Sequence, residues 1–299
     1  MLRCLVVNAD DLGLTVGVND GIFDAHDRGI LTSASVFANA PATADAVRRA
    51  HLRPSLGVGV HLALVDGAPT LPPSRVPSLV EDDGRFRRSW GPFIVACLRR
   101  RIAFEEVERE LTAQIDRIRS QGIRLTHLDA HKHVHAFPPI FAIVARLADR
   151  FRIPVVRVPY ERLSPAWGDG RQRRIARRQA VMNLAMRPWA RRNYRTTLAH
   201  GLRAPQFVGR THTGVLGADS LAGMVRRLGP VVTELMVHPG YVDDALRQAH
   251  TRLMSSRERE VELLCAPDTH RLLIEEQIQL IRHDLGLSER RSFHHASQQ

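Results

Sequence analysis

The sequence predicts an α/β fold with a mainly parallel sheet. Six short apolar runs rich in β-branched residues recur along the 299 residues, and segments with helical periodicity separate them. Strands that alternate with helices are typical of βα units, whose strands pair in parallel. The candidate strands are Leu5–Asn8, Thr32–Phe37, Gly57–Leu62, Leu125–Ala130, Pro154–Pro159 and Val231–His238.

Two helical segments stand out between these strands, because their apolar residues recur every three or four positions. The first has its apolar stripe at Phe104, Val107, Leu111, Ile115 and Ile118 and is expected to end at a Gly122 cap. The second has its stripe at Ile140, Ile143, Val144, Leu147 and Phe151. Both patterns predict helices that cover the sheet.

We expect one domain over residues 1–287, interrupted by two insertions. Residues 66–92 are rich in proline and glycine and predict a long excursion loop. Residues 161–212 predict an inserted, basic helical lobe. Long excursions of this kind are often binding loops. The polar tail 288–299 is expected to be disordered.

The net charge of +12 is concentrated in one segment. Residues 171–195 hold nine arginines and no acidic residue, so the rest of the chain carries about +3. All but one of the 43 basic residues are arginine, and the exception is Lys132. A dispersed phosphate-binding surface is therefore not indicated, and we expect no nucleic-acid partner. A basic helix with an apolar face and Trp189 suits peripheral contact with a membrane surface. A solvated basic helix that packs on the rest of the domain is an equally open interpretation of the same segment.

The chain has no apolar run of eighteen residues and no apolar N-terminal stretch long enough for a signal peptide. The three cysteines, Cys4, Cys97 and Cys265, are far apart and odd in number. They predict neither a disulfide framework nor a thiolate metal site. Together these features lead us to expect a cytoplasmic protein.

Acidic and imidazole side chains cluster where four of the predicted strands end. Asp10 and Asp11 follow the first strand, and His61 ends the Gly57–Leu62 strand. Asp129 and His131 close the fourth strand, and His238 ends the strand before the HPG turn. In parallel α/β folds the carboxyl ends of strands form the rim on which active sites are built. The sequence therefore predicts one site that joins these residues.

Each residue also has a structural interpretation. An Asp pair can cap the next helix, and a single buried histidine such as His61 is often only a core residue. On an extended segment alternate residues share a face, so the histidines and Asp129 within residues 127–135 would all project together. Such a set is costly to bury without a ligand. A metal site is the better interpretation.

Aspartate and histidine ligands without thiolates suit Zn²⁺, or a harder ion such as Mg²⁺ or Mn²⁺. Such an ion polarises a carbonyl and lowers the pKa of bound water. Neighbouring residues of a strand point in opposite directions, so we expect the two carboxylates of the Asp pair to divide the work. One would bind the ion, and the other would accept a proton.

Four segments of the chain resemble the motifs of the YdjC-like carbohydrate deacetylases. They are VVNADDLG, GVGVHL, THLDAHKHVH and VHPGYVD, and their order and spacing match over residues 1–160 and 205–287. Within that family the chain is most similar to the hopanoid-biosynthesis-associated branch, through the Arg-rich segment and FVGRTHTGVLGADSL. The resemblance implies a distorted (βα) TIM-like barrel, one divalent metal ion (Zn or Mg) and a homodimer.

The resemblance also implies an activity, the hydrolysis of the acetamide of an N-acetylated amino sugar on a hopanoid lipid. It implies these roles: Asp11, His61 and His131 as metal ligands, Asp10 as general base, His238 as general acid and Asp129 as the residue that orients them. The family usually has serine where this chain has Ala130, which affects at most a hydrogen bond near the site. We expect Lys132 to point outward into solvent.

Three other functions remain open at this point. The substrate could be a soluble chito-oligosaccharide, or the chain could be a barrel metallohydrolase of another amide. Amidohydrolases of that kind often carry an HxH pair after the first strand, where this chain has Asp10 and Asp11. A basic nucleic-acid-binding module would use residues 171–195, but it leaves the clusters at the strand ends unexplained.

Overall fold

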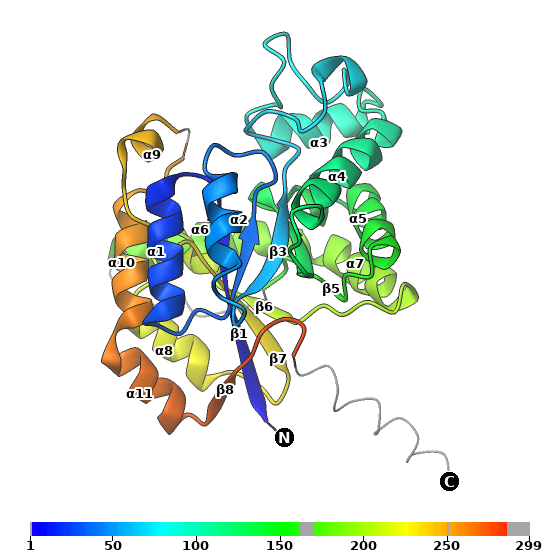
Figure 1. Cartoon of the computed structure of the whole chain (residues 1–299). Helices are drawn as coiled ribbons and strands as arrows, with labels where there is room; N and C mark the ends of the chain where they lie inside the picture. Colours follow the sequence, from blue (N-terminus) through cyan, green and yellow to red (C-terminus); the bar gives the residue numbers. More distant parts are fainter. Residues whose placement is uncertain (1, 162–169, 250, 286–299) are drawn as a thin grey trace.

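A curled parallel sheet forms the centre of the computed structural model (Figure 1). The structure describes residues 2–161, 170–249 and 251–285. Within these residues the strand order is β5-β4-β3-β2-β1-β7-β6, and β8 pairs with β1. The strands are β1 (Arg3–Leu12), β2 (Ser33–Val36), β3 (Gly57–Leu62), β4 (Leu125–Ala130), β5 (Val155–Val156), β6 (Gln206–Val208), β7 (Val232–Val237) and β8 (Ile278–Leu280).

Every strand pair in this sheet is parallel, as the alternating pattern predicts. The strand β1 lies at the centre, with β7 on one side and β2 on the other. Its first residues, Arg3–Leu5, pair with β8, so β8 extends the same edge that β2 occupies farther along. The α/β class and the parallel sheet are thus confirmed, in the form of a curled half-barrel.

Two of the predicted strands, β3 and β4, have the expected bounds, whereas β1 runs on to Leu12 and therefore contains both aspartates of the pair. The predicted strand Pro154–Pro159 shrinks to Val155–Val156. Single parallel bridges then link Val155 to Arg203 and Glu161 to Phe207, which brings the chain near β5 beside the chain near β6. The strands β6 and β8 were not predicted, because three residues are too few to show the alternation of apolar and polar residues that marks a strand.

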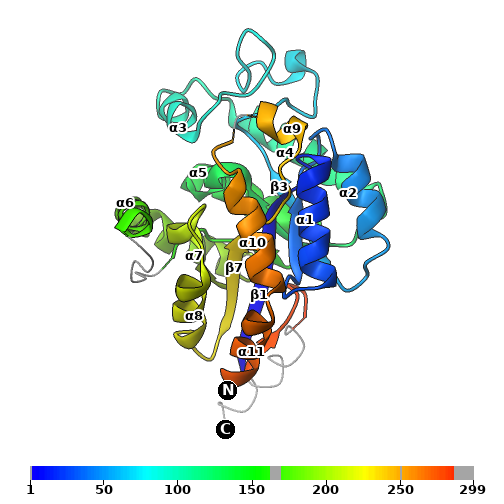
Figure 2. The same ribbon diagram turned by 90° about the vertical axis from the view of Figure 1, so that its left-hand side faces the viewer.

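Helices surround the outside of the curled sheet (Figures 1 and 2). The outward residues of its strands are apolar and join the core, whereas alternate residues on the inner face include the buried polar side chains of Asn8, His127 and Glu234. The bounds of the helices are α1 (Val16–Asp27), α2 (Thr43–Ala50), α3 (Trp90–Leu98), α4 (Phe104–Arg119), α5 (Pro138–Arg150), α6 (Gly170–Ala185), α7 (Arg187–Ala199), α8 (Ala218–Arg226), α9 (Asp244–Gln248), α10 (Ser255–Cys265) and α11 (Pro267–Glu275). Both helices singled out in the sequence are present as α4 and α5. Gly122 follows α4 with φ +81°, as its capping role requires.

The Arg-rich segment is helical and divides into α6 and α7 at Met186, next to Pro188, which occupies the first turn of α7. No helix of the described ranges is long and apolar enough to cross a membrane. The tail 288–299 lies outside the described residues.

The excursion of residues 66–92 contains only the 3₁₀ turn Pro73–Arg75 and one antiparallel bridge, between Val80 and Phe86, before α3 begins. Two glutamates of α4 hold it in place. The buried Glu110 carboxylate accepts hydrogen bonds from the backbone amides of Thr70 and Leu71, at 2.7 and 3.0 Å. Glu106 accepts one from Ser78 at 2.8 Å. The loop is thereby fixed above the carboxyl ends of the strands.

Candidate metal and active site

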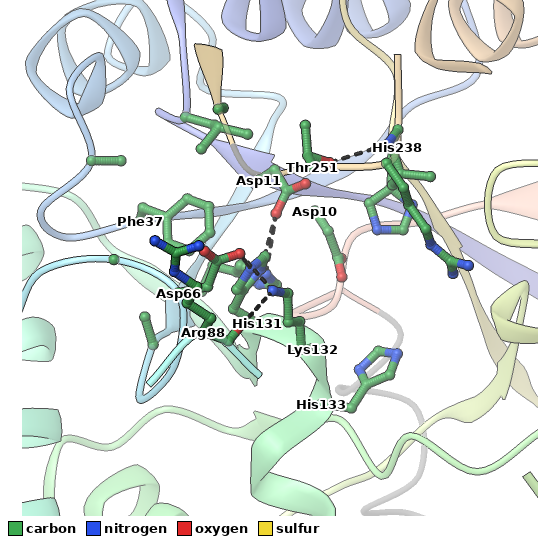
Figure 3. A pocket seen from close by; sticks show the side chains of 18 of the residues that line it. Asp10, Asp11, Phe37, Asp66, Arg88, His131, Lys132, His133, His238 and Thr251 are labelled. Carbon is green, nitrogen blue, oxygen red and sulfur yellow. Dashed lines mark hydrogen bonds and ion pairs between the residues drawn. The ribbon is translucent and has the colours of Figure 1, made fainter. Parts of the chain in front are cut away.

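A cavity of about 1010 Å³ opens at the carboxyl ends of the strands (Figure 3). Five of the six predicted site residues line it: Asp10 and Asp11 from β1, His61 from β3, His131 after β4 and His238 after β7. The sixth, Asp129, is fully buried behind His61. The structure therefore brings all six predicted residues to one place.

The Asp pair reaches the cavity through an irregularity in β1. The pairing of β1 with β2 shifts register between Ala9 and Leu12, which is the signature of a β-bulge. Asp11 has φ +70° and Gly13 has φ +91°, so the chain leaves the extended conformation at this point. Both carboxylates consequently line the same cavity. The expectation that they point in opposite directions is wrong, because it assumed a regular strand.

Three predicted ligands converge on one point. Asp11 Oδ1 lies 3.5 Å from His61 Nε2 and 3.4 Å from His131 Nδ1. Ligands about 2.0–2.1 Å from a tetrahedral ion lie roughly 3.3–3.4 Å apart, so these spacings match a shared cation. Phe37 packs edge-on against both imidazoles, with ring centroids 4.8 and 5.2 Å away, and limits their rotation. The donor set and its spacing therefore fit a divalent metal ion.

His61 belongs to a second group with Asp10 and Asp129, whose ligand atoms also lie within 4.8 Å of one another. His61 Nδ1 forms a 2.7 Å hydrogen bond with Asp129 Oδ1. Ser35 donates a 2.6 Å hydrogen bond to the other oxygen of Asp129. A carboxylate on the far nitrogen of a metal-binding histidine fixes the tautomer and the ring orientation. Asp129 thus has the geometry of a residue that orients His61.

A buried arginine occupies the centre of this second group. Arg157 donates to both oxygens of Asp10, at 2.7 and 2.8 Å, and to Glu234 at 2.7 Å. It also lies 2.9 Å from Asp129 Oδ2. Burial alone would raise the pKa of Asp10, but the Arg157 guanidinium together with His61 and His238 outweighs burial and lowers that pKa to about 2. Asp10 is therefore ionised and held in one orientation.

A second buried arginine, Arg257 of α10, donates to one of the two carboxylate oxygens of Asp11, Oδ2, at 2.6 Å. Burial opposes the charge on Asp11, yet Arg257 and His131 hold the pKa of Asp11 well below its usual range. Oδ1 remains directed toward the two imidazoles. The Asp11 carboxylate is thus ionised with one oxygen available to a cation.

His238 follows directly after β7 and is placed by close packing of the backbone. A Cβ atom on Gly21 of α1 would overlap the backbone of Gly240, so only glycines allow the HPG turn to approach this helix. The backbone amide of His238 donates a 2.6 Å hydrogen bond to the buried Glu260. Burial lowers the pKa of His238 to about 4, although Asp10 and Asp11 act in the opposite direction. The imidazole is therefore neutral near pH 7.

The histidines of residues 127–135 do not share one face. The strand β4 ends at Ala130, and the chain turns through the 3₁₀ segment His131–Ala136, in which His133 has φ +54°. His127 stacks on His283 with ring centroids 3.8 Å apart, and His135 bonds to the backbone oxygen of Arg157. His133 lines the cavity away from the three ligands (Figure 3). The predicted extended segment is wrong beyond Ala130.

Lys132 also differs in part from expectation. Its ammonium group donates to Asp66 at 2.6 Å and to the backbone oxygen of Arg88 at 3.0 Å. Asp66 itself approaches His131 Nε2 at 3.5 Å. Burial would raise the pKa of Asp66, but His131 and Lys132 lower it to about 2. Lys132 is exposed, as expected, but its ammonium group also joins the excursion loop to the site (Figure 3), which the expectation did not include.

Four polar residues of the site were not identified from the sequence: Arg157, Glu234, Arg257 and Asp66. Two of them carried a usable signal. Arg157 and Glu234 interrupt the apolar runs VVRVPY and VTELMV, and a charge within a buried strand requires a partner. Arg257 lies in an ordinary polar helix and Asp66 in a loop, so neither had such a signal.

The chain is similar to known proteins over nearly its whole length. The profile of the YdjC-like protein family matches residues 4–275. A carbohydrate deacetylase from Brevibacillus brevis is 36% identical over 93% of this chain and 97% of its own. A second carbohydrate deacetylase, from Geobacillus stearothermophilus, is 34% identical over 94% of this chain and 97% of its own. The fold is also similar to a crystal structure from Enterococcus faecalis, described as a cellobiose-phosphate cleavage protein. The TM-score is 0.77 and the sequences are 25% identical, and the match covers 95% of this chain and 98% of the other. The chain therefore belongs to the YdjC-like carbohydrate deacetylase family and, like the relatives named for that activity, is an enzyme.

Proposed function

We propose that this enzyme is a metal-dependent hydrolase that removes the N-acetyl group from an acetylated amino sugar. One observation carries the proposal: Asp11, His61 and His131 converge at ligand spacing in a cavity that also holds Asp10 and His238. The relatives named as carbohydrate deacetylases support the same reaction.

Asp11, His61 and His131 would hold the ion, which is zinc or magnesium by the chemistry of the ligands. A divalent ion bound there supplies the Lewis acidity that polarises the acetamide carbonyl and makes water a better nucleophile. Asp129 keeps His61 in the tautomer that presents Nε2 to the ion. The remaining steps belong to the protein's own side chains.

Asp10 is the proposed general base. A carboxylate has about four lone-pair sites, and Arg157 and Asn8 take three of them. The remaining site is free to accept a proton from the water that attacks the acetyl carbon. A carboxylate with a pKa of about 2 holds that proton only briefly, so the proton passes on as the tetrahedral intermediate breaks down.

His238 is the proposed general acid. The imidazole enters the reaction neutral, and negative charge that develops on the substrate oxygen favours its protonated form. The imidazole takes up the proton that Asp10 accepted from the attacking water and gives it to the sugar nitrogen as the carbon–nitrogen bond breaks. The products are acetate and the free amine.

An N-acetylglucosamine-type head group on a hopanoid lipid is the substrate we propose. The cavity, at about 1010 Å³, has space for more than one sugar ring, and Trp90, Met182 and Leu253 give its wall an apolar part. A soluble chito-oligosaccharide is the alternative substrate that the same site accommodates.

Acetate release tests the proposal. Purified enzyme would be stripped with a chelator, reloaded with Zn²⁺ or Mg²⁺, and assayed on an N-acetylglucosaminyl lipid and on chito-oligosaccharides. We expect acetate and free amine in equal amounts from the reloaded enzyme, and none from the stripped enzyme or from Asp10→Asn. Full turnover by Asp10→Asn would overturn the base assignment, and no release from any substrate would overturn the reaction.

A further inference from the structure

We propose that α3 and α6 form a docking surface for an anionic lipid bilayer beside the mouth of the cavity. The two helices are called here the rim helices. The inference concerns where the enzyme works, and it rests on the proposed function only in assigning a lipid-linked substrate.

The helix α3 has an apolar face that the protein does not cover. Phe93, Ile94 and Cys97 are buried, but Val95 is 46% exposed and Leu98 is 68% exposed. Trp90, at the start of the helix, is 37% exposed. Exposure of these apolar side chains to water is unfavourable, so covering this face with an apolar phase lowers the free energy.

Arginines surround this apolar face. Arg99, Arg100 and Arg101 follow α3 and are exposed. The sequence has no acidic residue between Asp83 and Glu105. Across the described ranges, no carboxylate pairs with these three arginines. Their charge is therefore available to an external anion.

The helix α6 repeats this combination. It packs on the protein through Ala176 and Asn183, which are buried. Arg174, Arg178 and Val181 lie on the opposite side of the helix and are exposed, Val181 by 70%. The sequence has no acidic residue from position 170 to position 218.

Both rim helices lie on the same side of the molecule, as Figure 2 shows. Gln179 and Met182 of α6 line the cavity. Arg88 and Trp90 line it where the excursion loop enters α3. A flat surface that touches both helices would therefore lie next to the mouth.

An anionic bilayer suits this surface better than nucleic acid does. Aliphatic side chains among arginines match the boundary between lipid head groups and acyl chains. Single-stranded nucleic acid is held by aromatic stacking, and among the exposed apolar residues named here only Trp90 is aromatic. Docking would bring the head group of a membrane-anchored substrate directly to the cavity.

Vesicle co-sedimentation tests the docking surface, using the full chain and phosphatidylcholine vesicles with or without phosphatidylglycerol. One variant carries Arg99→Gln, Arg100→Gln and Arg101→Gln, and another carries Arg174→Gln, Arg177→Gln and Arg178→Gln. The matched control carries Arg117→Gln, Arg119→Gln and Arg124→Gln, near the amino end of β4 and away from the cavity. Each basic residue near an anionic surface contributes roughly fivefold in affinity, so we expect at least about tenfold weaker binding for each rim variant.

Val95→Ser with Leu98→Ser tests the apolar contribution, with Ile274→Ser as a control at another exposed site. We expect the Val95→Ser, Leu98→Ser variant to bind vesicles more weakly than wild type and the Ile274→Ser control to bind them equally well. Wild-type binding that ignores phosphatidylglycerol, rim variants that bind like wild type, or rim arginines that bind duplex DNA while vesicles do not bind would each overturn the proposal. Turnover of a water-soluble N-acetylated sugar should be equal in all variants, so failure of docking and failure of the proposed reaction are distinguishable.

Discussion

Two groups of candidate ligands share His61, and their difference explains the site. Asp11 and His131 form one group with it, and Asp10 and Asp129 form the other. In the second group Arg157 already supplies the positive charge, through bonds to both carboxylates. In the first group Arg257 reaches only one oxygen of Asp11, Oδ2. A fixed cation fills one group, and the other group retains a place for a metal ion.

Two buried glutamates show the same contrast. Burial raises the pKa of each, but Arg157 and His283 reverse the effect at Glu234 and lower its pKa. At Glu260, on the Arg257 side, burial prevails and raises the pKa to about 7. On the Arg157 side the carboxylates are therefore balanced by positive charge that the protein itself supplies. On the Arg257 side the protein supplies less positive charge, so a bound cation would be stabilised there.

The largest expected effect comes from Arg157→Met, which leaves Asp10, Asp129 and Glu234 buried without their shared cation. Removing one partner of a buried ion pair costs about 3–5 kcal/mol, and we expect a loss of unfolding free energy at least this large. Urea unfolding measures it. Arg257→Met is the comparison, because it removes the arginine partner of Asp11 alone. We expect a smaller loss of unfolding free energy, part of which added Zn²⁺ should restore. An Arg157→Met protein as stable as wild type would show that the two groups do not differ in this way.

Glu260→Gln should change how stability depends on pH. The pKa of Glu260 is about 7 in the folded protein against an ordinary 4.5, so the folded state keeps a proton that the unfolded chain has lost. The stability that this group contributes therefore falls as pH rises from about 4.5 to about 7, by about 3–4 kcal/mol at 1.4 kcal/mol per pKa unit. The glutamine oxygen can still accept from the His238 amide. Thermal unfolding at pH 5 and pH 8 should show a flatter profile for the variant, and parallel profiles would refute the assignment.

Asp129→Asn should weaken metal binding by about 10–100-fold, because the amide no longer holds His61 as a carboxylate does. Glu234→Gln is the matched control: it also removes an acidic partner of Arg157, but it does not touch His61. Competition with a chelator of known affinity measures both variants. Equal metal affinity in the two would mean that Asp129 acts only on Arg157.

The smallest effect is expected for Lys132→Met. The ion pair with Asp66 is partly exposed, so its loss should cost under about 1 kcal/mol and raise KM a few-fold while kcat changes little. Lys132→Arg, which keeps the charge, should remain near wild type. A large fall in kcat would place Lys132 in the chemistry instead of in the attachment of the loop.

The sequence predicted the parallel α/β class and the convergence of six site residues, because strand ends in such folds meet at one edge. It misjudged the details that depend on local irregularity. The bulge after Ala9 and the turn after Ala130 redirect Asp11 and His133, and neither leaves a mark in the apolar pattern.

Arg157 and Arg257 could not be placed because their partners lie far away in sequence. Arg157 reaches Asp10 across 147 positions, and Arg257 reaches Asp11 across 246. Both are fully buried, which a hydropathy pattern reads as exposed. A charged residue within a strand indicates that a partner exists, but only the fold identifies it.

The division of labour within the Asp pair is the centre of this account, and metal content measured by elemental analysis tests it most directly. Asp10→Asn and Asp11→Asn remove the same charge from neighbouring residues. We predict that Asp10→Asn retains about one divalent ion per chain without releasing acetate, and that Asp11→Asn loses the ion. An Asp11→Asn protein that keeps its ion while Asp10→Asn loses it would contradict the account.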